Sequence, residues 1–478
     1  MTEQTFLFYD LETSGLSKTF AQVVEFAAIR TTIDLQEIER EHFYVKLTKD
    51  VVPEPDAFIT HQLGLTKLTS GLPEHKAIER IHSMLNKPGT ISLGYNTLGF
   101  DDEFLRFSFA RCLLPPYTHQ YMNNCGRVDL YPLVILYYLY SNSIMQWPDI
   151  DGKTSMKLEH IAAINNWLTG QAHHAMTDVE ATLSLAKALA ANADMWNFVL
   201  GYFNKQQDLE RIRTYCHVVL QDQLPNAYQA LLVWGKFGSS VDYIAPALCF
   251  GVHKVYKNQI IWLRLDKLEL QSLAEDLVGL SSFVIRKKLG EAPIVLPWKN
   301  KYLQKVSDDV QKLVADNIAF LAKSHSLCEK IRDSVLTQEY PQLEGVDLDA
   351  NLYQAKFPTR EEQFLCQDFR SCLESKQDSS LLQAFLDEQQ KRKAIRYVWR
   401  FYDQLLPEPY KDEMLNYWYK ITDEAGSIYD FKGKHRTSPA AALARVKTLQ
   451  DEDLMSQQVE ILKQIEHYLK EHFNLIED

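Results

Sequence analysis

The hydrophobic and polar positions of the first hundred residues predict a sheet of four strands. Runs rich in Phe, Val, Ile, Tyr and Thr predict three consecutive antiparallel strands, at Thr5–Tyr9, Val23–Thr32 and His42–Leu47. Apolar residues at helical spacing predict a helix over Glu74–Leu85, and Thr90–Leu93 is typical of a further, buried strand. We therefore expect a mixed sheet with helices packed on it.

Beyond the first strands the pattern changes from strand to helix. Pro53-Glu54-Pro55 predicts an extended loop. Past the fourth strand, apolar residues at helical spacing predict four more helices, over Asp101–Arg111, Tyr131–Tyr140, Met156–Ile164 and Asp178–Ala191. In the last of these, Asp178 lies in the first turn, where a negative charge suits the helix dipole.

The character of the chain changes again beyond residue 195. Short β-rich runs predict a small β-domain, with strands at Tyr215–Leu220, Tyr243–Phe250, Gln259–Leu265 and Ser282–Ile285. A helix is expected over Asp308–Leu321. From Asp349 onward almost every segment is amphipathic and helical, ending in Met455–Phe473.

The length of the chain supports several domains. At 478 residues it exceeds what one core holds, and about 150 residues per domain suggests roughly three. The polar stretch Tyr340–Leu348 marks one boundary, and we predict domains at residues 1–194, 195–345 and 346–478. The net charge of -12 argues against a protein that coats nucleic acid non-specifically, because such a surface repels phosphate. It leaves room for a nuclease with a local basic channel.

Cysteine usage and the first residues indicate a reducing compartment. The 7 cysteines, odd in number and without a C-x-x-C pair, fit free thiols better than a disulfide framework. Met1-Thr2-Glu3-Gln4 lacks the basic region of a signal peptide, and no apolar run approaches about 18 residues. We expect a cytoplasmic protein that does not span a membrane.

Two carboxylates, Asp10 and Glu12, follow the first strand. Alternate residues of an extended segment point the same way, so this pair can bind one hard divalent cation. Taken alone, such a pair after a strand more often belongs to a solvated turn than to a metal site. Asp101, after a Gly-containing loop, either joins such a site or caps its helix. Asp178, with His173 five residues before it, offers a further carboxylate and an imidazole.

Together, these four acids and one histidine suit phosphodiester hydrolysis by two metal ions. Two divalent ions about 3.5–4 Å apart need several carboxylates, lower the pKa of a bound water and stabilise the leaving oxygen. The mechanism also needs a general base with a pKa near the working pH, for which histidine is the natural choice.

The same residues carry a resemblance to a known family. Three segments resemble the motifs of the DEDDh exonuclease superfamily, which has an RNase H-like fold: Asp10-x-Glu12-Thr13, Asn96-x-x-x-Phe100-Asp101 and His173-x-x-x-x-Asp178. Longer segments resemble the bacterial exodeoxyribonuclease I family, namely Gly94-Tyr95-Asn96, Leu158-Glu159-His160 and Ala175-Met176 with Asp178-Val179. The resemblance is strong over residues 5–190 and weaker but collinear afterwards.

This resemblance implies a fold and a set of roles. The fold is α/β, with an RNase H-like mixed-sheet exonuclease domain, then an SH3-like β-containing domain and an all-helical C-terminal domain. Two Mg²⁺ ions, replaceable by Mn²⁺, would be held by Asp10, Glu12, Asp101 and Asp178, and His173 would be the general base. Substrate contacts would come from Glu12, Thr13 and Lys157, the last at a position where the family usually has arginine. His174, at a commonly acidic position, is assigned no chemistry.

The implied activity is a 3′→5′ exonuclease on single-stranded DNA that releases nucleoside 5′-monophosphates in DNA repair and recombination. Its implied partners are single-stranded DNA and the C-terminal tail of the single-stranded DNA-binding protein, and we expect a monomer. Two alternatives stay open. One is an RNA exonuclease of the same superfamily, because the metal motifs do not discriminate the sugar. The other is a non-catalytic single-strand-binding clamp. Basic residues of the family are missing near Ser141 and Asp403.

Overall fold

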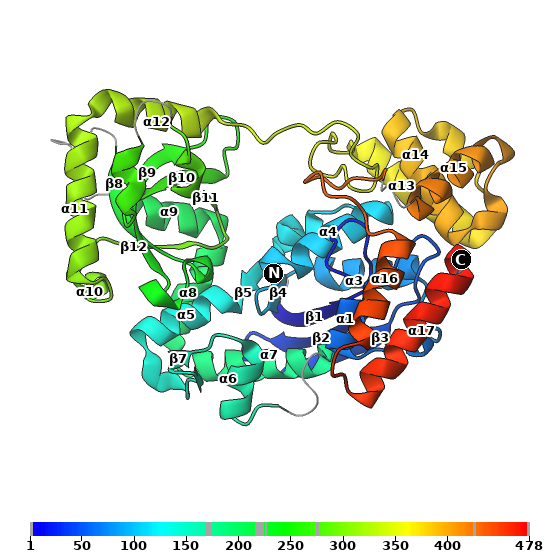
Figure 1. Ribbon diagram of the computed structural model, residues 1–478, viewed down its shortest axis with the longest axis horizontal. Helices are drawn as coiled ribbons and strands as arrows, with labels where there is room; N and C mark the ends of the chain where they lie inside the picture. Colours follow the sequence, from blue (N-terminus) through cyan, green and yellow to red (C-terminus); the bar gives the residue numbers. More distant parts are fainter. Residues whose placement is uncertain are drawn as a thin grey trace. The chain divides into compact units, whose positions relative to one another are not determined.

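The computed structural model describes residues 3–168, 174–215, 224, 227–273, 277–423 and 427–475; Figure 1 labels their helices and strands. By its internal contacts the chain divides into two compact units. The first comprises Met1–Gly126, Leu168–Thr182 and Gln342–Asp478, and the second Arg127–Trp167 and Leu183–Pro341. The three successive domains expected from the sequence stay a prediction.

Four strands of the first unit form the predicted mixed sheet. They are β1 (Thr5–Thr13), β2 (Val23–Thr32), β3 (Glu37–Tyr44) and β4 (Thr90–Gly94), in the order β3-β2-β1-β4. β1 pairs antiparallel with β2 and parallel with β4, and β2 pairs antiparallel with β3. β3 begins at Glu37 instead of His42, because its first residues form a solvated edge whose polar side chains conceal the strand pattern.

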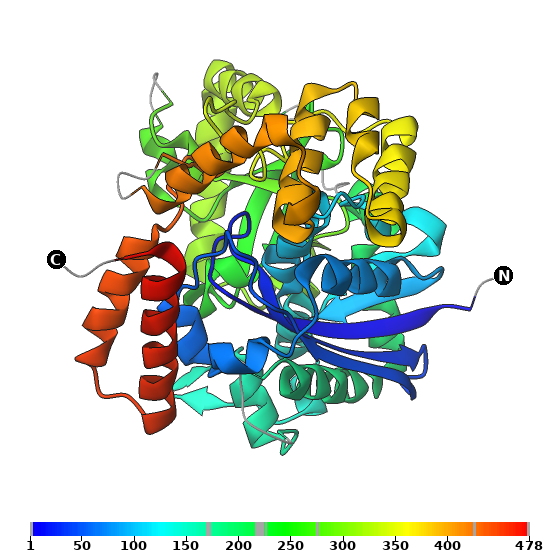
Figure 2. The ribbon, with the colours of Figure 1, turned by 90° about the vertical axis from the view of Figure 1, so that its right-hand side faces the viewer.

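Different helices cover the two faces of this sheet. α3 (Glu74–Asn86) and α4 (Asp101–Arg111) lie on one face, and the first turns of α7 (Ala175–Ala190) lie on the other (Figures 1 and 2). Leu7, Tyr9 and Leu11 of β1 share a buried core with apolar residues of α3 and α4. Because side chains alternate along a strand, the intervening Asp10 and Glu12 face the side on which α7 begins.

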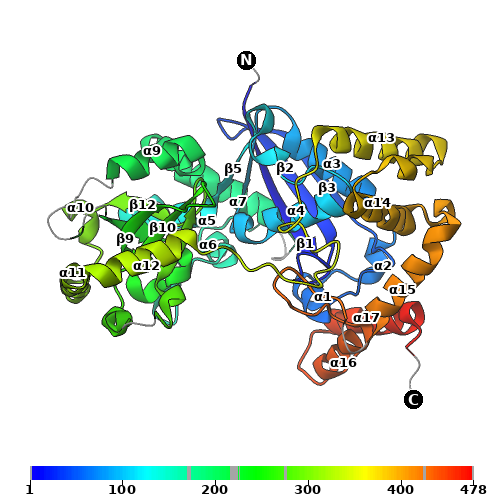
Figure 3. The ribbon, with the colours of Figure 1, turned by 90° about the horizontal axis from the view of Figure 1, so that it is seen from above.

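The C-terminal part of the first unit is helical, as predicted. Its helices are α13 (Arg360–Lys376), α14 (Glu388–Phe401), α15 (Lys411–Thr422), α16 (Pro439–Gln450) and α17 (Ser456–Phe473). α16 and α17 pack against α1 (Pro55–His61), and α17 also packs against α2 (Leu65–Leu68) (Figure 3). The final helix thereby contacts elements that follow β3 directly in the chain.

The loop predicted at Pro53-Glu54-Pro55 is wrong at its last residue, because Pro55 is the first residue of α1. Proline lacks a backbone N–H and has φ near −65°, and both properties suit the first turn of a helix. Two prolines close together therefore mark a helix start here and not only an interruption.

The second unit contains a five-stranded antiparallel sheet in the order β11-β10-β9-β8-β12. Its strands are β8 (Tyr228–Val233), β9 (Ile244–Val252), β10 (Gln259–Arg264), β11 (Val284–Lys288) and β12 (Ile294–Pro297). Its helices are α5 (Leu130–Tyr140), α6 (Leu158–Ile164), α8 (Ala193–Leu200), α9 (Lys205–Tyr215), α10 (Asn300–Leu303), α11 (Asp308–Lys323) and α12 (His325–Thr337). The short strands are β5 (Gly126–Asp129), which starts at the boundary, β6 (Asp149–Ile150) and β7 (Lys153–Thr154).

Most elements expected in this unit are confirmed. The runs at Tyr243–Phe250 and Gln259–Leu265 correspond to β9 and β10, whereas the strand predicted at Ser282–Ile285 begins only at Val284 and extends to Lys288 as β11. The strand predicted at Tyr215–Leu220 is wrong at its first residue, which ends α9, and its remainder lies outside the described residues. The cysteines that the structure describes are free thiols. Over the same described ranges, no helix combines the length and the apolar character needed to cross a membrane.

A buried network of ion pairs joins α14 to the segment that follows β3. The Arg400 guanidinium on α14 donates to Asp50, with 2.7 Å between Nε and Oδ2, and to Asp349. Arg396, one turn earlier, donates to Asp347 at 2.7 Å and to Asp349 at 3.1 Å. Burial, the largest single influence, disfavours the ionised form of Asp50, but the charges of Arg400, Arg436 and Arg111 together outweigh burial and lower the pKa of this carboxyl. The ion pairs therefore keep buried carboxylates ionised inside the first unit.

Replacing Arg400 by Leu should destabilise the first unit strongly, because the buried carboxylates of Asp50 and Asp349 each lose one cationic partner. We expect the free energy of unfolding to fall by about 3–5 kcal/mol. The matched control is Arg445→Leu on α16, whose ion pair with Asp56 is 40% and 57% exposed and should contribute less than about 1 kcal/mol. Urea denaturation followed by circular dichroism measures both, and equal effects would contradict a structural role of the buried network.

Candidate active site

Asp10 and Glu12 lie inside β1, one residue apart, so their side chains leave the same face of the sheet. The pairing with β2 places Asp10 opposite Ala27 and Glu12 opposite Glu25. A register shift follows directly, between Glu12 and Thr13. The strand therefore ends just beyond the two acids, and a third carboxylate, Glu25, faces the same side as Glu12.

Asp178 joins this pair from α7. Asp178 lies in the first turn of this helix, as predicted. The first turns of α7 cover the face of the sheet that carries Asp10 and Glu12. Carboxylate oxygens of Asp10, Glu12 and Asp178 lie within 4.8 Å of one another. Residues separated by more than 160 positions thus converge, and the structure brings together three of the four acids expected to hold metal.

Asp101 is the first residue of α4 and is buried. It lies outside the group of three oxygens, but its charge acts on that group. Burial is the largest cause that raises the pKa of Asp10 well above its ordinary value, followed by repulsion from Asp101, Asp178, Glu12 and Glu25. The pKa of Glu12 is also raised well above its ordinary value, by burial and then by Asp178, Glu25 and Asp101.

The charges around Asp10 and Glu12 indicate whether these residues suit a metal ion. Among the residues that the structure describes, the charged groups that shift the pKa values of Asp10 and Glu12 are carboxylates. Oxygen donors at close range are the ligands that hard divalent cations prefer. A divalent cation at this place would replace the mutual repulsion by attraction, so the donor set fits a metal centre of the Mg²⁺ or Mn²⁺ type.

Three further residues were predicted for the site, namely His173, Thr13 and Lys157. His173, the expected general base, lies outside the described residues. Thr13 is buried, and its hydroxyl donates to the carbonyl of Gly15 at 2.9 Å. Lys157 precedes α6 in the second unit and is 70% exposed, with its Nζ 3.3 Å from Glu159. Neither observation tests a contact with substrate.

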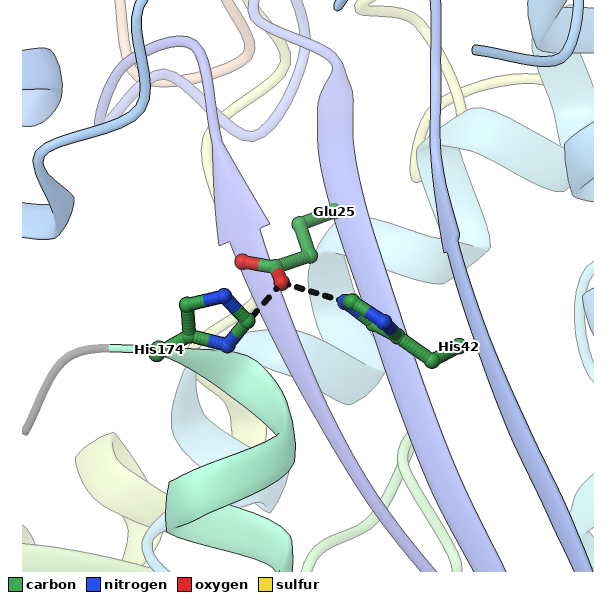
Figure 4. Close-up of side chains that lie close together, drawn as sticks. All are labelled: Glu25, His42 and His174. Carbon is green, nitrogen blue, oxygen red and sulfur yellow. Dashed lines mark hydrogen bonds and ion pairs between the residues drawn. The ribbon is translucent and has the colours of Figure 1, made fainter. Parts of the chain in front are cut away.

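Sequence reasoning missed a second group of side chains that could hold a metal ion, formed by Glu25, His42 and His174 (Figure 4). The signal for Glu25 was present, because it is the one charged residue in the apolar run from Val23 to Ile29. The sequence holds no such signal for His42 and His174, because their approach to Glu25 depends on strand register and on where α7 begins.

Comparison with known proteins agrees with this geometry. Residues 7–186 match the family model described as RNase_T, exonuclease. Exodeoxyribonuclease I of Escherichia coli (strain K12) is 28% identical over 379 residues, which cover 74% of this chain and 77% of that protein. Its counterpart in Buchnera aphidicola subsp. Schizaphis graminum is 27% identical over 436 residues, or 87% of each chain. The crystal structure of E. coli exonuclease I in complex with a dA16 oligonucleotide matches with a TM-score of 0.80 and 22% identity, over 98% of this chain and 100% of that chain.

The fold, the converging acids and the matched domain together define an enzyme of the exonuclease class, whose exonuclease domain spans residues 7–186. Within that class, the chain resembles exodeoxyribonuclease I over most of its length. The resemblance inferred from the motifs is therefore confirmed. The predicted fold class is confirmed as well, since the structural match extends over almost the whole chain.

Replacing Asp10 by Asn should stabilise the metal-free protein, because it removes one charge from a group of mutually repelling carboxylates. We expect a gain of about 1 kcal/mol or more, the equivalent of roughly one pKa unit. A pKa that is higher in the folded state means that folding is favoured while the group is protonated and is opposed once it ionises. The gain should be absent below the ordinary carboxyl pKa and grow as the pH rises through the raised pKa of Asp10. Thermal melts in EDTA over a pH series measure it.

The matched control is Asp102→Asn, the same chemical change on α4. Asp102 is buried and accepts hydrogen bonds from Arg106 and, at 2.9 Å, from the His119 Nε2. Losing its charge should destabilise the protein by about 1–3 kcal/mol. If both variants shift stability in the same direction at neutral pH, repulsion at Asp10 is not the cause.

Proposed function

We propose that this chain is a 3′→5′ exonuclease that hydrolyses single-stranded DNA to nucleoside 5′-monophosphates with two divalent metal ions. The observation that carries the proposal is the convergence of Asp10, Glu12 and Asp178 within 4.8 Å, on a sheet face where burial and repulsion raise the pKa values of the β1 acids. A group of carboxylates that destabilises itself without a cation suits a metal centre better than a structural role.

The proposed ligands are Asp10, Glu12, Asp178 and Asp101, with Mg²⁺ as the physiological metal and Mn²⁺ as a substitute. When bound, two such ions activate a water and stabilise the charge that develops on the leaving oxygen. β1 supplies two ligands from a rigid strand, and α7 and α4 each supply one from a first turn, so the donor set is held by regular structure.

We assign the proton transfer to His173, whose imidazole would accept a proton from the attacking water. This residue directly precedes His174, whose Nδ1 lies 3.2 Å from Glu25. Glu12 and Thr13, at the end of β1, would contact the terminal nucleotide, and Lys157 would contact the strand as a point charge. These roles rest on the family resemblance and on the placement of the acids.

The substrate class rests on relatives. E. coli exonuclease I has been solved in complex with a dA16 oligonucleotide and in a zinc-bound form with single-stranded DNA, and a further similar structure is described as SSB/exonuclease I in complex with an inhibitor. We propose that this chain likewise acts on single-stranded DNA, as a monomer, in DNA repair and recombination. We also propose that it binds the C-terminal tail of the single-stranded DNA-binding protein.

Digestion of labelled oligomers tests the proposed activity. With Mg²⁺, a 5′-labelled single-stranded DNA oligomer should shorten from its 3′ end and release 5′-monophosphates, whereas duplex DNA and RNA should be degraded much more slowly. Faster digestion of RNA would favour an RNA exonuclease, and binding of single strands without digestion would favour a non-catalytic clamp.

The control in the same assay is a pair of acid-to-alanine variants. Asp10→Ala should lower turnover more than about 1000-fold, because several kcal/mol of transition-state stabilisation is lost. Asp34→Ala removes an exposed acid from the turn between β2 and β3 and should change nothing. Comparable activity in both variants would contradict the assignment of Asp10.

His173→Ala should slow hydrolysis by about 10²–10⁴-fold, the usual contribution of a general base, without weakening Mn²⁺ binding. Single-turnover kinetics and calorimetric Mn²⁺ titration separate the two effects. The control is His467→Ala, which removes an exposed imidazole of α17. Loss of Mn²⁺ binding in His173→Ala would instead make this residue a ligand.

A further inference from the structure

Glu25, His42 and His174 form a second compact donor group in the first unit. Glu25 lies on β2 and is fully buried, His42 lies on β3, and His174 directly precedes α7 (Figure 4). The Glu25 Oε1 is 2.6 Å from the His42 Nε2 and 3.2 Å from the His174 Nδ1. One ligand atom from each residue lies within 4.8 Å of the others.

Strand register explains why these side chains meet. Glu25 pairs with Tyr44 on β3, and Ala27 pairs with His42. Glu25, His42 and Tyr44 therefore leave the same face of the sheet, with His42 diagonal to Glu25. The first turns of α7 cover this face, which places His174 above the two strands.

The chemistry of this group differs from that of the acidic site. Two imidazole nitrogens and one carboxylate are the ligands of many zinc sites, in which the fourth position is left to water or substrate. The side chains of His42 and His174 are 31% and 32% exposed, so a fourth ligand can reach the centre from solvent. The three carboxylates of the acidic site instead suit a hard cation.

The spacing is close to what a tetrahedral ion requires. With metal–ligand bonds of 2.0–2.1 Å, neighbouring ligand atoms lie about 3.3 Å apart. The separation of Glu25 from His174 already matches this value. The His42 ring would have to withdraw from Glu25 by roughly 0.7 Å, to the spacing of a tetrahedral site.

A residue outside the donor group orients one of the histidines. The hydroxyl of Tyr44 lies 3.4 Å from the Nε2 of His174, and the Nζ of Lys67 lies 4.5 Å from the centroid of the Tyr44 ring. A hydrogen bond from Nε2–H to this hydroxyl leaves the lone pair of Nδ1 free to face Glu25. Histidine ligands are commonly oriented in this way through their second ring nitrogen.

We propose that Glu25, His42 and His174 form a binding site for a divalent transition metal of the Zn²⁺ type, separate from the ligands of the catalytic ions. The ion would join the start of α7 to β2 and β3 and thereby fix the helix that carries Asp178. The site goes beyond the proposed nuclease function, since it requires neither DNA nor hydrolysis.

Equilibrium dialysis against Zn²⁺ in a large excess of Mg²⁺, followed by elemental analysis, tests the site. The parent for this experiment is full-length Asp10→Asn, which removes a ligand of the acidic site. We expect this parent to bind one Zn²⁺ per chain. Adding His42→Gln or His174→Gln should weaken Zn²⁺ binding at least about 100-fold, and adding Tyr44→Phe should weaken it about 10-fold.

The matched control is Asp10→Asn with His467→Gln, which removes an imidazole elsewhere in the unit and should bind Zn²⁺ like the parent. Both substituted histidines of the site are partly exposed, and thermal melts verify that each variant is folded. Equal Zn²⁺ uptake with and without His42 and His174, or none in the Asp10→Asn parent, would overturn the proposal. Failure here leaves digestion of DNA in Mg²⁺ unaffected, so the two proposals fail independently.

Discussion

The mutual repulsion of carboxylates on one face of the β1–β2 sheet is the constraint on which the rest of the first unit depends. Asp10, Glu12 and Asp178 lie too close together to be ionised without cost, and Asp101 and Glu25 add to the repulsion. Removing charge from such a group would favour folding. We therefore attribute the presence of all these acids to the cation that they would bind. Residues needed for activity commonly lower the stability of the fold in this way.

The fold keeps these acids together through regular structure. The pairing of β1 with β2 and the packing of α3 and α4 behind the sheet position Asp10 and Glu12, while the start of α7 positions Asp178. Elsewhere in the same unit, Arg400 pairs with Asp50 and Asp349. These buried carboxylates have cationic partners from the chain itself, so burial alone does not distinguish the acids proposed to bind metal. The sign of the neighbouring charges distinguishes the two groups of buried acids.

Local patterns in the sequence were sufficient to predict most of the elements. The strands β1, β2 and β4 and the helices α4 and α11 follow from runs and periodicities that packing does not override. The start of β3 was missed because an edge strand can be polar, and α1 was missed because Pro55 both interrupts and begins structure. Such ambiguities are resolved only by contacts between distant segments.

The same distinction applies to the candidate site. Asp10, Glu12, Asp101 and Asp178 were predicted as metal ligands because each belongs to a motif with fixed spacing. Glu25, His42 and His174 have no such spacing, since they come together only through the register of β2 with β3 and the position of α7. Groups of side chains that strand register brings together cannot be predicted from a single sequence.

The most direct test of this account is the location of Mn²⁺ by anomalous scattering from crystals of the intact chain grown with that ion. The account predicts Mn²⁺ bound between the carboxylates of Asp10, Glu12 and Asp178. Crystals in which these three carboxylates contact no Mn²⁺, while the protein digests single-stranded DNA in the same buffer, would contradict it.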